Sequence, residues 1–272
     1  MIFTAFALPV FIAEEELVAY SYYQIQYHQK MDNAIDDALY SMVEKDTYEE
    51  VTINKEECIS NFYQSFYGNF GVENTVVTRN QIRQHIPMIG VVERDRFSIA
   101  YQQPVQKNGN WELTDAWTKE VFYEYEENGI RYQFQLGDKK DWVKVCFLYK
   151  NRSTESENIQ WIEGFYKELA KRDIRFFWMA NEEQFEQVRR NTILCCIKQS
   201  MEMVSNEYNQ IGKRGGFLYE FHLPNIEKQD WCRTIDDIGI MVLFQGYPVQ
   251  GTIGKTYTRF VYSGARTYKQ KR

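Results

Sequence analysis

Acidic and imidazole side chains, the groups that bind divalent metals and transfer protons, occur together in one stretch of the 272-residue chain. Glu220 and His222 alternate along a predicted strand, so their side chains would share one face of it. Asp236 and Asp237 follow shortly afterwards. These four residues define a candidate pocket for a ligand-binding sensor or a metal-dependent enzyme. The alternative is a strand with a polar face, followed by a capped turn at residues 230–232.

Two segments with glycine and lysine resemble phosphate-binding loops. The first ends in Gly254–Lys255–Thr256, but a Walker A loop needs a glycine five residues before its last one, and Val249 occupies that position. A β-rich stretch also follows it, where a phosphate-binding loop should open a helix. The second segment, residues 212–216 (GKRGG), follows a predicted helix instead of preceding one. We therefore interpret residues 246–256 as a turn between two strands.

The histidines and cysteines provide few further candidates for catalytic residues. No GxSxG and no CxxC motif occurs in the sequence. Adjacent cysteines on a helix point about 100° apart, which makes Cys195 and Cys196 a poor joint metal site, and we interpret the cysteines as small buried apolar residues. The sequence therefore predicts a non-enzymatic protein with no catalytic residue, no cofactor and no metal. The residues considered are His28, His85, His222, Cys58, Cys146, Cys195, Cys196 and Cys232.

Composition points to a folded protein whose aromatic residues either form its core or make contacts with a large partner. Aromatic residues make up 16% of the chain, and rings favour both pleated sheets and half-exposed contact faces. The net charge is −6, whereas binding to nucleic acid would need a basic surface. We therefore expect other protein subunits as partners, in a homo- or hetero-oligomer, and no nucleic acid. Basic residues cluster only at the end of the chain, at Arg266, Lys269, Lys271 and Arg272.

The first residues form an apolar leader. Residues 2–13 are almost wholly apolar, but they are fewer than the ~20 residues that span a bilayer, and Glu14, Glu15 and Glu16 follow them. Each acid costs about 2.5–3.5 kcal/mol at the centre of a bilayer, so the three outweigh the apolar run. No basic segment precedes the run, as a signal peptide would require. We predict contact with a membrane or with other subunits through Phe3, Phe6, Leu8, Pro9, Val10, Phe11 and Ile12.

A long helix should follow the leader. Residues 14–44 contain neither glycine nor proline, so nothing in them breaks a helix. One interpretation is a helix that packs on the sheet of its own domain. The other is a helix whose first part enters a membrane or a filament core, while its second part packs on its own domain. The three- and four-residue steps that predict one apolar stripe involve Val18, Tyr22, Ile25, Ile35, Leu39 and Met42.

The rest of the chain favours an α+β fold, a mainly antiparallel sheet with two further helices. Its predicted elements run as strands, then helices, then strands, without the alternation of a parallel α/β fold. Asn128–Gly129 is the strongest hairpin signal. We predict residues 1–45 as leader and helix and residues 46–272 as one globular domain. Predicted strands cover residues 86–92, 96–102, 121–126, 130–136, 142–149, 175–179, 217–223, 238–244 and 257–262, and predicted helices cover 156–171 and 182–211.

Residues 6–11 (FALPVF) resemble the start of TadE-type and other pilin-like proteins. Such proteins carry an apolar N-terminal helix with an early proline, a glutamate shortly after it and a head of helices and sheet. Residues 245–266 are also similar to envelope proteins of Gram-positive pilus or secretion loci. The resemblance implies a subunit of the cell envelope or surface with no active site. A soluble structural protein of a virion or mobile element, or a cytoplasmic protein, is the alternative.

Overall fold

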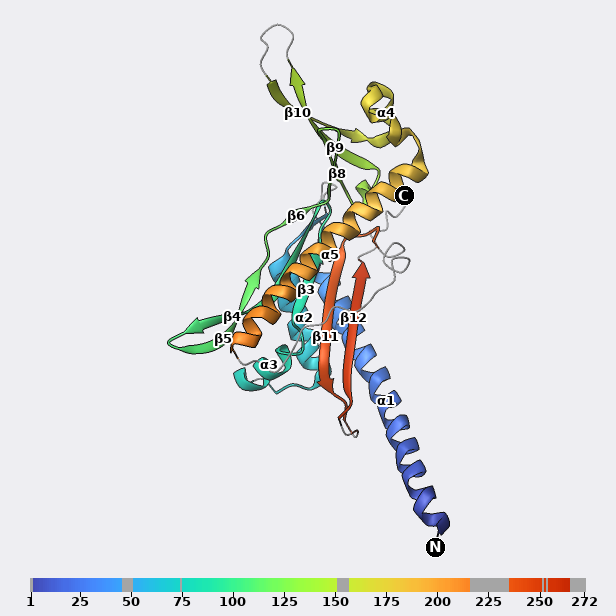
Figure 1. Ribbon diagram of the computed structural model, residues 1–272, viewed down its shortest axis with the longest axis vertical. Helices are drawn as coiled ribbons and strands as arrows, with labels where there is room; N and C mark the ends of the chain where they lie inside the picture. The colour runs from blue at the N-terminus through green and yellow to red at the C-terminus, as the bar shows by residue number, and fades with distance from the viewer. Residues whose placement is uncertain are drawn as a thin grey trace. The chain divides into compact units, whose positions relative to one another are not determined.

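The computed structural model describes residues 2–45, 51–73, 75–150, 157–215, 235–250, 252 and 254–264 (Figure 1). The chain forms two compact units. The first comprises Met1–Ile89 and Met241–Ser263, and the second comprises Gly90–Ile240 and Gly264–Arg272. The fold class is α+β, as the sequence predicts, with N-terminal helices, antiparallel sheets and further helices. The boundary that the sequence predicts between residues 45 and 46 stays a prediction.

Helices and the C-terminal strands make up the first unit. A capping interaction starts its second helix, since the side chain of Asn54 accepts a hydrogen bond of 3.2 Å from the backbone N–H of Glu57. Gly71 ends that helix in the left-handed conformation, with φ of 65°. Strand β11 lies between β12 and β3 in the strand order, and β1 pairs with β2. The elements are α1 (Ile2–Met42), β1 (Val43–Lys45), β2 (Val51–Ile53), α2 (Lys55–Phe70), α3 (Val76–Arg83) and most of β11 (Gly239–Pro248) and β12 (Thr256–Gly264); β3 (Met88–Val92) begins in this unit and ends in the second.

Aromatic rings form the centre of the first unit. The centre of the Phe66 ring on α2 lies 5.5 Å from the centre of the Phe244 ring on β11, in the edge-to-face geometry that aromatic pairs favour. Tyr27 on α1 lies 5.6 Å from Phe70 and 5.4 Å from Tyr257. The aromatic-rich composition is therefore used, in part, to join α1, α2 and the C-terminal strands into one core.

The second unit has a four-stranded antiparallel sheet in the order β10-β9-β8-β7. Asn128 and Gly129, both with positive φ, form the turn between β7 and β8, which confirms the predicted hairpin. Strand β4 pairs with β5 and with β6. The elements are β4 (Arg96–Lys107), β5 (Asn110–Trp117), β6 (Val121–Phe122), β7 (Glu124–Glu127), β8 (Ile130–Phe134), η1 (Gly137–Lys139), β9 (Trp142–Lys150), β10 (Glu157–Phe165), α4 (Tyr166–Arg172), η2 (Ile174–Ala180) and α5 (Glu182–Gly215).

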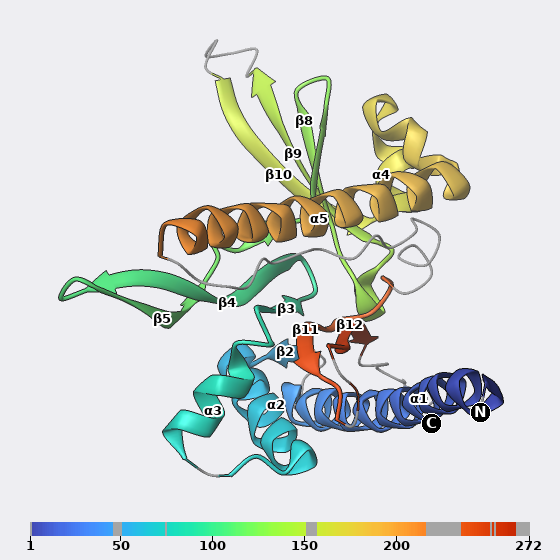
Figure 2. The same cartoon turned by 60° about the horizontal axis from the view of Figure 1, so that its bottom comes forward.

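One face of the four-stranded sheet is buried under helices. In Figure 2, α5 crosses the strands that include β8 and β9. The ring of Phe185 on α5 lies 5.8 Å from Phe134 on β8 and stacks on Tyr166 of α4 at 3.9 Å. Val143 and Val145 of β9 are buried on the same face. Because side chains alternate along a strand, the opposite face of β9 and β10 points away from this core.

Two of the predicted elements are wrong. Residues 157–165 form β10, and helix is confined to Tyr166–Arg172, whereas the sequence predicts a helix over 156–171. Nine residues of β10 pair with β9, so cross-strand pairing overrides the apolar spacing that favours a helix. Residues 175–179 belong to the helical turn η2, not to a strand, and Asp173 starts that turn by accepting a hydrogen bond from the backbone N–H of Arg175.

The long helices and most other strands are confirmed. Helices α1 and α5 agree with the predictions over 14–44 and 182–211. Helices α2 and α3 and strands β1, β2 and β5 were not predicted from the sequence. The predicted strand at 217–223 lies outside the described residues.

Candidate functional site

The N-terminal half of α1 presents an uncovered apolar face. Val18, Tyr22 and Ile25 are each 58–70% exposed. At about 100° per residue, Tyr22 and Ile25 lie within roughly 40° of Val18 around the helix, so the three form one stripe. In Figure 1, this half of α1 extends beyond the other helices and strands of its unit. We call Val18, Tyr22 and Ile25 the outer stripe.

The buried side of α1 lies opposite the outer stripe. Tyr27, Met31 and Ala34 are buried, and Tyr27 follows Val18 by nine residues, a rotation of about 180°. Ile35 and Leu39 are also buried, so the prediction that they share one apolar stripe with Val18, Tyr22 and Ile25 is wrong. The reason is the ten-residue step between Ile25 and Ile35, which turns the helix by about 280° rather than by a whole number of turns.

Strand β12 and Lys255, the residue before it, hold α1 in its unit. Arg259 donates from Nη1 to the backbone oxygen of His28 at 3.0 Å and forms an ion pair with Asp32 at 3.0 Å. Burial and the charge of Arg259 both lower the pKa of His28. Nearer the N-terminus, Nζ of Lys255 lies 5.2 Å from the centre of the Tyr20 ring. These contacts fix α1 in its unit through residues other than the outer stripe.

The residues predicted to make membrane or assembly contacts precede the outer stripe. Their backbone belongs to α1, but their side chains lie outside the described residues, so the prediction stays a prediction. Among the helices of the described residues, none is both long enough and apolar enough to cross a membrane. The predicted residues are Phe3, Phe6, Leu8, Pro9, Val10, Phe11 and Ile12.

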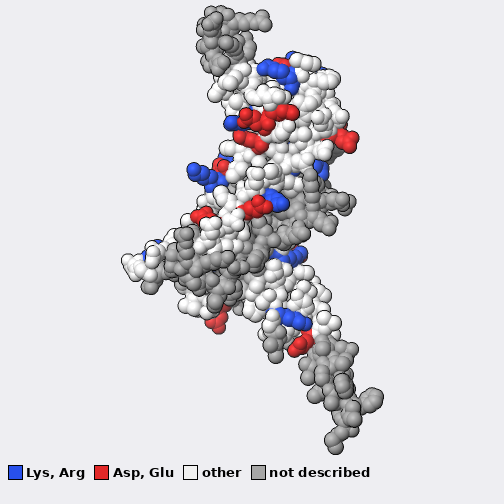
Figure 3. Space-filling view, viewed as in Figure 1, with Lys and Arg blue, Asp and Glu red and all other residues white. Residues whose placement is uncertain are grey.

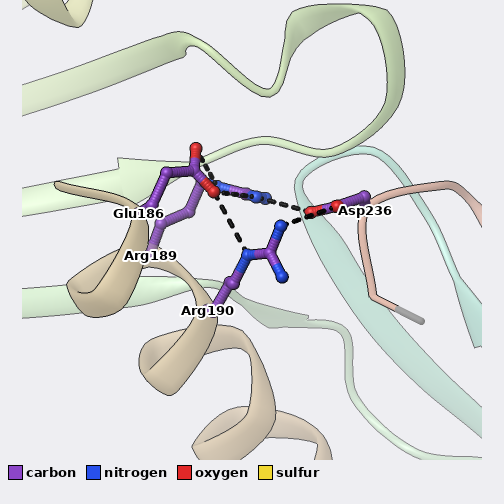
Figure 4. Close-up of polar contacts among 4 residues, drawn as sticks. All are labelled: Glu186, Arg189, Arg190 and Asp236. Atoms are coloured by element: carbon purple, nitrogen blue, oxygen red, sulfur yellow. Dashed lines mark hydrogen bonds and ion pairs between the residues drawn. The ribbon is translucent and has the colours of Figure 1, made fainter. Parts of the chain in front are cut away.

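A cluster of four charged side chains joins α5 to the segment before β11 (Figure 4). Nη2 of Arg189 donates to Asp236 Oδ1 at 2.7 Å and to Glu186 Oε2 at 2.8 Å. Arg190 donates from Nη2 to Asp236 Oδ2 at 2.8 Å and from Nε to Glu186 Oε2 at 3.2 Å. The backbone oxygen of Asp236 accepts a further hydrogen bond of 2.8 Å from Gly137 N–H. Asp236 thus ties its segment both to α5 and to the loop that follows β8.

The two positive and two negative side chains of this cluster give it no net charge. Arg189 is 0% exposed, and two carboxylates face the two guanidinium groups. Burial alone would raise the pKa of Glu186, but the hydrogen bonds and charges of Arg189 and Arg190 outweigh burial and lower that pKa. Nη1 of Arg189 is buried without a hydrogen-bond partner among the described residues. An ionised carboxylate already occupied by two arginines is a poor general base, so the arrangement acts as a structural clamp.

The predicted pocket shares one residue with this cluster. Asp236 makes the two ion pairs described above, and Asp237 lies beside it in the chain. Glu220 and His222 lie outside the described residues, so the pocket as a whole stays a prediction. Within the described ranges, no three His, Cys, Asp or Glu side chains come together as a metal site.

Glu186, Arg189 and Arg190 are not among the site residues predicted from the sequence. Their spacing of three and four residues along a helix is the spacing at which carboxylates and arginines pair, so the local pairs could have been predicted. Nothing in the spacing indicates that Asp236, 46 and 47 residues later, completes the cluster.

The described cysteines fit their predicted role in part. Cys58 is buried, and burial raises the pKa of its thiol to about 12, which makes it unreactive at neutral pH. Cys195 is exposed, which contradicts the prediction for that residue. Its neighbour Cys196 lies with Sγ 3.5 Å from the backbone oxygen of Phe122. Cys232 lies outside the described residues.

Charges of both signs are interspersed over the face drawn in Figure 3, wherever the structure describes its residues. Several basic side chains of the described residues form ion pairs with acidic neighbours, as in the pairs Arg96–Glu120 and Lys167–Glu182. Such a surface gives no preference for a strongly acidic or strongly basic ligand.

Comparison of the chain with protein-family models, with curated proteins and with solved structures gives no match. Any proposal about function therefore rests on the residues and geometry described above.

Proposed function

We propose that this chain is a non-enzymatic structural or assembly protein, and that the N-terminal half of α1 is the surface by which it attaches. The observation that carries the proposal is the outer stripe of Val18, Tyr22 and Ile25, which is exposed although it is apolar. Further along the same side of α1, the helix carries the polar Gln29, Asn33 and Asp36 and then the amphipathic Tyr40.

The change from apolar to polar residues along this side of α1 favours a docking role for its N-terminal half. A helix side that only meets water needs no apolar residues, and the second half of α1 follows that rule with its three polar residues. Full burial of a Val or Ile side chain stabilises by about 1.5–3 kcal/mol. Covering the outer stripe would therefore contribute a few kcal/mol, a useful part of the affinity of an assembly contact.

The apolar residues 2–13 extend this surface in sequence. Their resemblance to the start of pilin-like proteins favours an envelope-associated subunit, a component of a surface appendage, whose first helix docks into a membrane or a filament. The strands and helices of the two units would then form its exposed head.

Cell fractionation with protease shaving tests the proposal. We expect the full chain to fractionate with the envelope, and its head to be degraded by protease added outside the cell. Deletion of residues 1–13 together with Val18→Gln, Tyr22→Gln and Ile25→Gln should release the protein in soluble form. A matched control is Val76→Gln with Val77→Gln, which removes two exposed apolar residues of α3 in the same unit and should leave fractionation unchanged.

Two results would contradict the proposal. If the deleted and substituted chain stays assembled and envelope-bound, attachment does not use this half of α1. If the intact chain is soluble and protected from protease, the envelope assignment fails. Lipid-free oligomers of that soluble chain would then favour a structural protein of a virion or mobile element.

A further inference from the structure

A second apolar surface lies on the four-stranded sheet of the second unit, far along the chain from α1. Leu148 of β9 and Ile159, Trp161 and Phe165 of β10 are each 50–68% exposed. They belong to the sheet face opposite the one that packs on α5, because Val143, Val145 and Phe147 alternate with them and are buried. We call these four exposed residues the open-face patch.

The strand register makes the patch contiguous. Leu148 lies directly opposite Ile159, and Trp161 lies opposite Cys146. At the end of β10, Phe165 pairs with Trp142, and their rings are 5.0 Å apart in an edge-to-face arrangement. Directly opposite side chains in an antiparallel pair lie about 4.5–5.5 Å apart at Cβ, so these residues touch across the two strands.

Strand β10 is also an edge of this sheet. The strand order is β10-β9-β8-β7, so the side of β10 away from β9 has no paired strand among the described residues. β10 has nine residues and contains no proline. A long edge strand without proline offers a row of backbone N–H and C=O groups to another strand, and monomeric proteins usually blunt such edges.

The size of the patch matches the apolar part of a standard protein interface. A fully exposed aromatic or large aliphatic side chain offers on the order of 150–250 Å², so four that are half exposed or more offer roughly 400 Å². A standard interface buries about 800 Å² on each partner, of which somewhat more than half is apolar, or about 450 Å². Pairing at the edge of β10 would bring only the β10 side chains of the patch into contact, so they would supply part of such an interface and backbone hydrogen bonds between the strands would supply the rest.

The charges beside the patch are self-complementary. Lys144 of β9 lies 4.0 Å from Glu163 of β10, so one positive and one negative group lie on the same sheet face as the patch. Two copies related by a two-fold axis would bring equal numbers of both signs together, with no net repulsion. A partner with a strongly charged surface would gain nothing from this pair.

We propose that β10 pairs antiparallel with β10 of a second copy of this chain across a two-fold axis. Antiparallel pairing about a two-fold axis lets one strand present the same donors and acceptors to itself, so a single edge suffices for both partners. The two four-stranded sheets then form one sheet of eight strands, with both open-face patches side by side on the same face. Ile159, Trp161 and Phe165 of β10 then contact the β10 side chains of the other copy across the seam. This inference concerns a surface other than the outer stripe and does not rest on the proposed function.

Analytical ultracentrifugation of the full chain over a range of concentrations tests the pairing. We expect the wild type to approach twice its mass of 32.6 kDa. Ile159→Lys and Trp161→Lys each place like charges near the two-fold axis and should weaken the dimer by at least about 100-fold. Ile174→Lys is the matched control, since Ile174 is 83% exposed on η2 of the same unit, and its dimer should be unchanged.

Amide hydrogen exchange of the wild type gives a second readout. It needs no variant, so it does not depend on whether a substituted chain folds. Pairing should slow exchange in β10 at high concentration, and dilution should restore it. A chain that is monomeric at all concentrations, or a dimer in which β10 exchange does not change on dilution, overturns the proposal. A dimer that is lost on deletion of residues 1–13 but survives Ile159→Lys and Trp161→Lys also overturns it, while leaving the proposed role of α1 intact.

Discussion

Asp236 accepts a hydrogen bond of 2.7 Å from the fully buried guanidinium group of Arg189, which lies 47 residues earlier in the chain. Arg190 donates to the other carboxylate oxygen of Asp236, and Glu186 accepts from both arginines. A buried guanidinium group is tolerated only where carboxylates balance its charge. The side chain of Asp236 therefore ties the segment before β11 to α5.

Asp236→Asn should destabilise the protein by about 2–3 kcal/mol, because it keeps the shape of the side chain and leaves Arg189 with one carboxylate fewer. Breaking a fully buried pair costs about 3–5 kcal/mol, and the partial exposure of Asp236 reduces that range. Urea unfolding measures the change. Lys167→Gln is the control, since its pair with Glu182 is solvent-exposed and its loss should leave stability nearly unchanged. Equal losses in the two variants would show that the cluster is not a clamp.

Stability should fall as the pH is lowered through the histidine range. Burial lowers the pKa of His85, although the hydrogen bond of 3.1 Å from its Nδ1 to the backbone oxygen of Gln245 partly opposes the change. The folded-state pKa is below the unfolded value of about 6.5, so between the two values the unfolded chain binds more protons. The contribution of neutral His85 is therefore present above pH 6.5 and is lost as the pH falls through the folded pKa.

Urea unfolding of the wild type and of His85→Gln between pH 5 and 8 checks this direction. The slope of the unfolding free energy against pH should be smaller in His85→Gln. Part of the slope should remain, because burial and Arg259 also lower the pKa of His28. Identical slopes in both proteins would assign the pH dependence to other groups.

The fold class and the long helices could be predicted because their signals are local. Helix α5 shows regular apolar spacing over its whole length, and Asn128–Gly129 allows the positive φ of a hairpin turn without reference to any distant residue. Residues 157–165 show the limit of such signals. Their apolar positions fit a helix, yet Ile159, Trp161 and Phe165 also fit the alternation of a strand, and only pairing with β9 decides between the two.

The described cluster could not be predicted as a whole, for a related reason. The spacing of Glu186, Arg189 and Arg190 can be recognised in the sequence. The contact of Asp236 with the two arginines depends on the tertiary fold and cannot. The sequence also left two interpretations of α1 open, because it shows that Val18 and Ile25 are apolar but not that the inner side of α1 is the one that packs.

Substituting alanine for Gly71 and for Gly68 should change the stability of the protein in opposite directions. Gly71 has φ of 65° at the end of α2, a conformation that costs an L-residue about 1 kcal/mol, so Gly71→Ala should destabilise by about that amount. Gly68 lies inside the helix, where alanine is favoured by up to about 1 kcal/mol, so Gly68→Ala should stabilise. A Cβ at either position would meet no atom within 4 Å, so backbone conformation alone decides both results. Thermal unfolding measures both shifts, and a stabilising Gly71→Ala would contradict the left-handed helix end.

The two sides of α1 should differ sharply in their effect on stability. Replacing Val18, Tyr22 and Ile25 together by glutamine should change the unfolding free energy by less than about 1 kcal/mol, because these side chains are exposed and glutamine is a good helix former. Met31→Ala on the buried side should cost about 2–5 kcal/mol. Urea unfolding of the two variants provides the comparison. A triple variant as unstable as Met31→Ala would mean that the outer stripe packs within the folded chain, and α1 would then have no free apolar side to offer a membrane or another subunit. A stable triple variant that no longer fractionates with the envelope would separate attachment from folding, since the same three side chains would then matter for docking and not for the fold.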